Sequence, residues 1–244
     1  VSSNMEDTYT FEIVEFSNPD AEILFVDDNM GDRLDVMFGY LASLESYSYE
    51  YWSVSDNKGI DKWTPIMGNW NTIIVAGWGV AAMTTRDYTV NDNPYSQWLS
   101  WGDRNLVYMD QDYFYAQGEE AGEITFAPGD FAYDIFGIEG GNNDPDDADD
   151  SFFGEAGSAL GDPWSGDPYV TDPDLAYGGR SWHDQITGSS STELQFTGDW
   201  GDYAITYEDV WKTAYFSFDP SANCYQDSFY YEPWEEWVLY LAPN

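Results

Sequence analysis

Three short, almost wholly apolar runs limit what this chain can fold into. They are EILFVD at 22–27, NTIIVAGW at 71–78 and NLVYMD at 105–110. Each has the length of one strand, and none shows the alternation of a strand that has one wet face. Such strands are buried on both faces, which is typical of parallel sheets covered by other elements. The runs therefore predict a buried parallel sheet.

The segments between these runs have patterns of their own. From Asp32 to Leu44 apolar residues recur at close to helical spacing. A short helix is expected at 94–101, because proline is favoured in the first helical turn and Pro94 stands there. The remaining expected elements are a strand at 47–54, a strand at 211–219 and a terminal helix at 232–241.

This order of elements predicts a single α/β domain over residues 1–244. We expect a mainly parallel, flavodoxin-like sheet with helices on both faces. Between 116 and 204 the pattern weakens into Gly, Asp, Pro and aromatic residues, which predicts a long irregular insertion with short strands such as ELQFTG at 193–198. Residues 1–20 are expected to form an N-terminal extension or an edge strand.

The charge of the chain excludes several kinds of partner. Forty-six acidic residues face seven Lys and Arg, and the formal net charge is -39. Such a surface repels nucleic acid and anionic membranes, and no apolar run approaches the ~20 residues that span a bilayer. It attracts hard cations such as calcium, or it suits a saline medium; both explanations stay open. The composition favours an extracellular or cell-surface location.

Several segments together resemble a known family. They are ILFVDDNMGD, YEYWSV, NTIIVAGW, NLVYMDQDYFY, FAPGDFAYDIFGIEG and KTAYFSFD, within residues 20–242. Their order is similar to that in the class I glutamine amidotransferase-like fold, in particular the ThuA-like modules of secreted bacterial proteins. The resemblance implies an amidotransferase-like sheet and, through the ThuA-like proteins, an association with sugar metabolism. This chain departs from the usual Gly-Gln-Asp-Tyr turn, since Asp110 stands at the glycine position.

The chemistry of amidotransferases is not expected here. It needs a thiolate on a strand-to-helix elbow and a histidine base. Cys224 lacks a Gly-x-Cys-x-Gly setting, and the single histidine, His183, lies in the polar stretch RSWHDQ. Serine elbows, GxGxxG turns and P-loops are also absent from the sequence. We therefore expect no catalytic residues and no organic cofactor.

Carboxylates are the remaining candidates for chemistry. Asp27 and Asp28 end one predicted strand, and Asp110 and Asp112 end another, so all four belong to the carboxyl edge where open α/β sheets bind ligands. Asp27, Asp28 and Asp112 could bind calcium or form an acid and base pair, or they could cap the following elements. A second calcium candidate, or a solvated loop, is the run Asp144, Asp146, Asp147, Asp149 and Asp150.

The aromatic residues point towards an interaction role. Twelve Trp and twenty Tyr exceed what a core of this size requires, and exposed rings stack on sugars or bury against partners. A candidate for strand exchange with a neighbouring copy, or for an edge strand of its own subunit, is the alternating segment with Tyr9, Phe11, Ile13 and Val14.

The sequence thus predicts a noncatalytic extracellular or cell-surface structural module. It is expected to contact copies of itself or other surface components, with calcium offsetting the repulsion between acidic faces. The alternatives are a carbohydrate-binding protein and a hydrolase that uses a carboxylate cluster.

Overall fold

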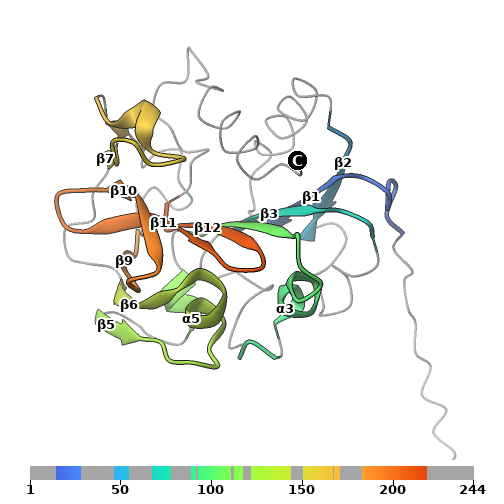
Figure 1. Cartoon of the computed structure of the whole chain (residues 1–244), viewed down its shortest axis with the longest axis horizontal. Helices are drawn as coiled ribbons and strands as arrows, with labels where there is room; N and C mark the ends of the chain where they lie inside the picture. Colours follow the sequence, from blue (N-terminus) through green and yellow to red (C-terminus); the bar gives the residue numbers. More distant parts are fainter. Residues whose placement is uncertain are drawn as a thin grey trace, which may run out of the picture.

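The sheet dominates the molecule. The computed structural model describes residues 15–28, 47–54, 68–77, 89–91, 93–110, 113–117, 122–143, 151–166, 168–170 and 183–218. Within these residues, twelve strands join into one mixed sheet (Figure 1). It has a parallel half and an antiparallel half, which meet where β12 pairs with β11.

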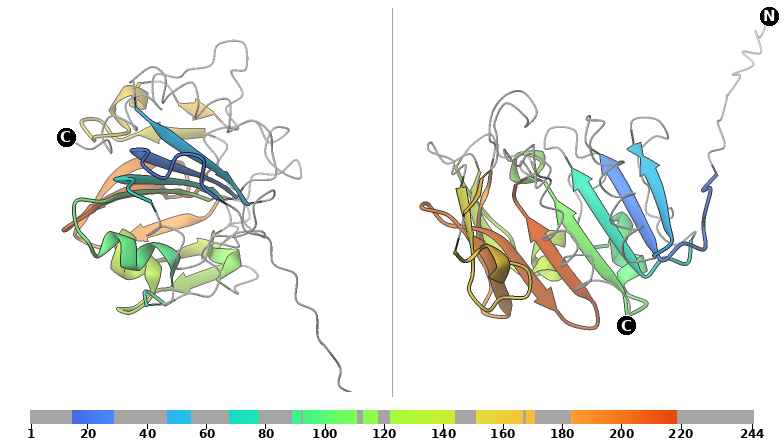
Figure 2. Two further views of the ribbon diagram at one scale, coloured as in Figure 1. Left: turned by 90° about the vertical axis from the view of Figure 1, so that its right-hand side faces the viewer. Right: turned by 90° about the horizontal axis from the view of Figure 1, so that it is seen from above.

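The parallel half has the strand order β2-β1-β3-β4-β12 (Figure 2). Its strands are β1 (Ile23–Asp28), β2 (Tyr49–Ser53), β3 (Thr72–Gly77), β4 (Asn105–Met109) and β12 (Lys212–Phe216). Every residue of β1 and β3 is buried, and the two strands pair from Ile23 with Thr72 to Asp28 with Gly77. The predicted positions of these five strands are confirmed.

The antiparallel half follows two paths away from β11. One path runs β11-β10-β7-β8 and the other runs β11-β9-β6-β5. The strands are β5 (Gly122–Thr125), β6 (Ile138–Asn143), β7 (Ser151–Gly154), β8 (Tyr169–Val170), β9 (Gln185–Gly188), β10 (Thr192–Thr197) and β11 (Asp202–Glu208). The paths separate at Asp202, which pairs with Thr197 of β10 and with Ile186 of β9.

The predicted fold class is wrong. A mainly parallel flavodoxin-like or amidotransferase-like sheet with helices on both faces was expected, but the sheet is mixed and the described residues are mostly strands. The region 116–204, expected to be an irregular insertion, supplies β5 to β10. These strands are short, and several contain glycine or alternate in exposure. They therefore lack the continuous apolar run by which a buried strand is predicted from sequence. Only the predicted strand at 193–198 is confirmed there, as β10.

The described α-helices are short and lie on one side of the sheet. They are α3 (Pro94–Leu99), α4 (Tyr113–Ala116) and α5 (Phe131–Phe136). The Asn93 side chain caps α3 by accepting from the Tyr95 backbone N–H at 2.9 Å. Gly137, with φ of 68°, ends α5 in the left-handed conformation. The predicted helices at 32–44 and 232–241 lie outside the described residues.

Apolar side chains cover both faces of the parallel half. One core cluster packs Phe25 and Ile74 against Phe152 and Tyr169, which come from β7 and β8. The other core cluster contains the alternate strand residues, such as Ile73, together with the buried side chains of all three helices. The continuous apolar runs of the sequence are explained by this burial on two sides.

Candidate functional site

The carboxyl edge of the parallel half carries buried carboxylates. Asp27 and Asp28 end β1, and Asp110 directly follows β4. All three are buried, and Asp110 is 0% exposed. The Tyr51 hydroxyl of the neighbouring strand donates a hydrogen bond to the Asp27 carboxylate. The prediction that these aspartates share one edge is confirmed by the register.

A glycine lets two of these carboxylates approach across one strand. Asp28 pairs with Gly77, and Gly77 lies beside Asp110 because Ala76 pairs with Met109. A Cβ on Gly77 would lie 2.7 Å from Oδ2 of Asp110. The Asp110 carboxylate therefore leans over Gly77 towards the strand that carries Asp28.

Tyrosines surround Asp110 on the side of β12. The Tyr215 hydroxyl donates to the Asp110 carbonyl oxygen at 3.3 Å. Burial is the main cause that raises the pKa of Tyr113 well above its ordinary range, and the negative charges of Asp110 and Asp130 raise it further. Burial also raises the pKa of Tyr215, and the negative charges of Asp184 and Asp110 raise it further. The raised pKa values favour the protonated phenols, and the Tyr215 hydroxyl serves as a hydrogen-bond donor.

Asp184 fixes a further element at this edge. Its fully buried carboxylate accepts from the backbone N–H of Phe114, in the first turn of α4, at 2.9 Å. His183 is buried as well, and its ring packs edge-on against Phe152 with 5.0 Å between ring centroids. The single histidine is thus part of the aromatic core.

Most of the remaining predicted site residues are not part of the described structure. Asp112, the run from Asp144 to Asp150, the segment with Tyr9, Phe11, Ile13 and Val14, and Cys224 all lie outside it. Among the described residues, no three His, Cys, Asp or Glu side chains are grouped so that they could hold a metal ion. The calcium and strand-exchange hypotheses stay predictions.

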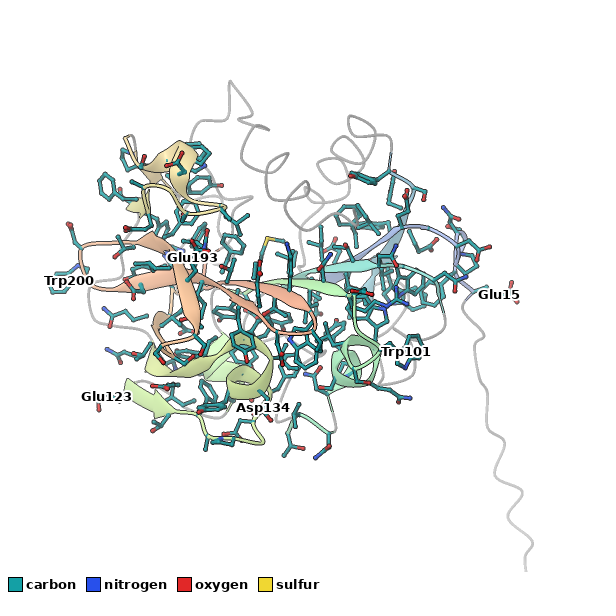
Figure 3. All side chains as sticks on the ribbon, viewed as in Figure 1. Glu15, Trp101, Glu123, Asp134, Glu193 and Trp200 are labelled. Atoms are coloured by element: carbon teal, nitrogen blue, oxygen red, sulfur yellow. The ribbon has the colours of Figure 1, made fainter. Side chains whose placement is uncertain are left out.

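An open groove of about 570 Å³ lies in the antiparallel half. We call it the Trp200 groove; its lining includes Glu123, Glu139, Asn142, Gln185, Trp200 and Asp202. Trp200 is 57% exposed. Figure 3 shows Trp200 and Glu123 on the same side of the molecule, one at the β10–β11 turn and the other on β5.

Short hydrogen bonds hold the loop that carries Trp200. Gln185 Nε2 donates to the Trp200 carbonyl oxygen at 2.6 Å. The Gly198 backbone N–H donates to the Gly201 carbonyl at 2.8 Å, and the Thr197 hydroxyl donates to the same carbonyl at 3.0 Å. The exposed indole is therefore presented by a closed turn that is anchored to β9.

Two glycines are among the residues that line the groove. Gly140 and Gly141 of β6 lie between β5 and β9. A Cβ on Gly140 would collide with the Ile124 carbonyl, and one on Gly141 with the Gln185 carbonyl. These positions exclude side chains, so the central strand of the groove carries none at its middle.

Carboxylates set the charge of the groove. Glu123, Glu139 and Asp202 line it, and none of its lining residues is basic. Burial raises the pKa of Asp202, while the hydrogen bond with Thr197 lowers it and the nearby Glu155 raises it further. This arrangement disfavours anionic ligands and offers several hydrogen-bond acceptors.

Sequence reasoning did not find this groove. Its exposed tryptophan lies in the turn GDWGD at 198–202, directly after the one strand predicted in this region. A large aromatic residue between two glycines in a tight turn is expected to be exposed, because a turn packs little against the core. This pattern was the one sign of the groove in the sequence. The partners on β5, β6 and β9 carry no comparable pattern.

Comparison with known proteins identifies no family. No family model matches the sequence, and no curated protein matches it. Among solved structures, the chain is similar to "Cytoplasmic Protein STM3548 from Salmonella typhimurium", with 12% identity, 91% of this chain and 100% of that chain covered, and a TM-score of 0.46. No conclusion about function follows from a likeness of this size. No described helix is long and apolar enough to cross a membrane.

Proposed function

We propose that this protein is a noncatalytic carbohydrate-binding module and that its ligand lies in the Trp200 groove. The observation that carries the proposal is a strongly exposed indole in a groove lined by carboxylate, amide and hydroxyl groups. An indole offers a flat apolar face, which matches the C–H face of a pyranose ring. The volume of the Trp200 groove, about 570 Å³, falls within the usual range of small-molecule sites.

The polar lining suits a ligand that is rich in hydroxyl groups. Asn142 and Gln185 supply amide groups that both donate and accept, and Thr125 and Thr187 supply hydroxyls. The carboxylates of Glu123, Glu139 and Asp202 accept hydrogen bonds from sugar hydroxyls. Neighbouring hydroxyls on a sugar ring need this mixture of donors and acceptors.

Charge and shape favour a neutral ligand. Anionic ligands are repelled by three carboxylates and by the net charge of -39. Quaternary ammonium ligands are bound by cages with several aromatic faces, whereas this groove has one aromatic residue, Trp200. A neutral saccharide is the class that fits both features.

The test compares two tryptophans of similar exposure. Trp200 is 57% exposed in the groove, and Trp101 is 52% exposed near α3, at the other end of the molecule (Figure 3). If a sugar ring removes about 50 Å² of apolar surface from water at Trp200, the contact contributes about 1.3 kcal/mol, close to tenfold in Kd. Trp200→Ala should therefore weaken binding about tenfold, and Trp101→Ala should leave it unchanged.

Calorimetry with neutral glucan, mannan and chitin oligosaccharides measures these constants. Binding of a neutral sugar should be the same at low and high salt, because no ion pair is screened. The proposal fails if none of these sugars binds, if Trp101→Ala weakens binding as much as Trp200→Ala, or if the sugar is recovered cleaved. Cleavage would instead favour the hydrolase alternative, in which carboxylates of the groove act on the glycosidic bond.

A further inference from the structure

A second hollow adjoins the Trp200 groove. It has a volume of about 240 Å³ and is lined by residues of β5 and by the segments around α4 and α5, among them Gln117, Phe126 and Asp130. The two hollows share Ile124 and Thr125 of β5. Both hollows therefore lie against the same strand, β5.

Both hollows are lined by aromatic, amide, carboxylate and hydroxyl groups, in different proportions. The Trp200 groove combines one aromatic ring with the Gln185 amide, the Asp202 carboxylate and a threonine hydroxyl. The second hollow is lined by three aromatic residues, Tyr113, Phe126 and Phe131, with the Gln117 amide, the Asp130 carboxylate and the hydroxyl of Thr125, which the two hollows share. Two neighbouring hollows that each offer aromatic and hydrogen-bonding groups fit a ligand whose units repeat.

Volume supports one ligand that occupies both hollows. At about 240 Å³ the second hollow is smaller than most independent small-molecule sites, whereas the groove alone is large enough to be one. Asp130 is held in place, because its carboxylate accepts from the Ala127 backbone N–H at 2.8 Å and it stands at the start of α5. The Phe126 ring packs against Phe114 with 5.4 Å between centroids. The side chains of Asp130 and Phe126 in the second hollow are thus held in place.

We infer that the ligand is an oligosaccharide chain that crosses β5, with one part on Trp200 and another beside Gln117 and Phe126. This inference rests on the proposed function. It adds that affinity depends on chain length, because only a chain of several units reaches the second hollow.

The experiment is a length series on three variants. Kd is measured by calorimetry for one neutral oligosaccharide type, from the monosaccharide to the hexasaccharide. Gln117→Ala removes the amide of the second hollow, while the backbone N–H of Gln117, which donates to Phe114 at 3.0 Å, is kept. The matched control is Gln97→Ala, an exposed glutamine on α3. Trp200→Ala removes the aromatic face of the groove.

In the wild-type protein, affinity should rise with length by at least tenfold and then level off. Gln117→Ala should abolish most of this rise, while the shortest sugar that binds keeps its wild-type Kd, which also shows that the variant is folded. Gln97→Ala should match the wild type, and Trp200→Ala should weaken every length.

Three results would overturn the inference alone: a wild-type Kd that does not change with length, a Gln117→Ala series equal to the wild type, or a Gln117→Ala variant that weakens the shortest sugar as much as the longest. Absence of binding at every length would overturn the proposed function as well, so the two failures are distinguishable.

Discussion

The two halves of the sheet differ in what covers their strands. In the parallel half, β1 and β3 are buried at every residue. Residues of β5 in the antiparallel half alternate between half-buried and exposed, and β10 becomes buried only near its end. Both hollows described above lie in the antiparallel half. Both halves contribute to the core, but strands with a wet face, which supply polar groups that a ligand can reach, are those of the antiparallel half around the two hollows.

The sharpest test of this difference removes the same side chain from each half. Ile73 on β3 is fully buried, and Ile124 on β5 is half-buried. Ile73→Ala should lower the free energy of unfolding by about 2–5 kcal/mol, because it leaves a cavity in a packed core. Ile124→Ala should cost about 1 kcal/mol, since less apolar surface is involved. Urea denaturation measures both values, and equal losses would contradict the contrast between the halves.

A glycine pair tests the carboxyl edge of the parallel half. Gly77→Ala places a Cβ 2.7 Å from the buried Asp110 carboxylate, so Asp110 must move from its place among Tyr113 and Tyr215. We expect a loss of about 1–3 kcal/mol, as for other overpacked sites.

The control for that substitution is Gly166→Ala. A Cβ on Gly166, in the β7–β8 connection, meets nothing within 4 Å. This variant should change the unfolding free energy by less than about 0.5 kcal/mol. Urea denaturation again gives both numbers. If Gly77→Ala has the wild-type free energy of unfolding, the carboxyl edge accommodates the added Cβ without cost, and the expected close packing around Asp110 is contradicted.

The sequence predicts the parallel half of the sheet better than the antiparallel half. Strands β1, β3 and β4 of the parallel half were located to within one residue, because burial on both faces leaves a continuous apolar run. Asp27, Asp28 and Asp110 were placed at one edge for the same reason, since strand ends are visible in the sequence. The prediction that α/β packing would continue throughout was wrong, because it extended the pattern of one half to the whole chain.

The antiparallel half resisted prediction for a physical reason. Its strand β6, IEGGNN, has two glycines where neighbouring carbonyls leave no room for a Cβ. Those glycines are required by packing, yet in a sequence they are typical of turns. The Trp200 groove is built from four strands and a turn, so its residues come together only through pairings that local patterns do not specify.

Calcium binding should have the next effect in size, because the sequence places one candidate site in the parallel half and one outside it. The sequence offers Asp27, Asp28 and Asp112 at the parallel edge and the run from Asp144 to Asp150 between β6 and β7. At a tenfold excess over Kd, a bound ion stabilises the folded state by about 1.4 kcal/mol. Calorimetric melting with calcium and with chelator measures this shift.

Two substituted proteins assign the shift to a half. Asp27→Asn should remove it if the edge binds the ion, and the double variant Asp146→Asn, Asp147→Asn should remove it if the loop does. Melting that does not change at millimolar calcium would show that neither cluster binds the ion.

The smallest expected effect concerns Asp202, where the two paths of the antiparallel half separate. Because burial raises its pKa in the folded state, the folded protein binds more protons than the unfolded chain between the ordinary aspartate pKa of about 3.9 and the raised value. The contribution of Asp202 to stability therefore falls as the pH rises through that window. Above that window its charged carboxylate destabilises the fold.

Asp202→Asn should consequently raise Tm at pH 7 and leave it unchanged at pH 3, where the carboxyl group is protonated in both states. The control, Asp199→Asn, changes an exposed aspartate in the same turn and should have little effect at either pH. A variant that is less stable than the wild type at pH 7 would show that the hydrogen bond with Thr197 outweighs burial. If Asp202→Asn stabilises the fold but weakens saccharide binding, the carboxylate is retained at a cost in stability, as is common for residues that serve a ligand rather than the fold. Substitutions of the buried residues of β1 and β3 are expected to lower stability without this gain. Measuring both Tm and the Kd for saccharide on the same variants therefore distinguishes residues that serve the fold from residues that serve a ligand.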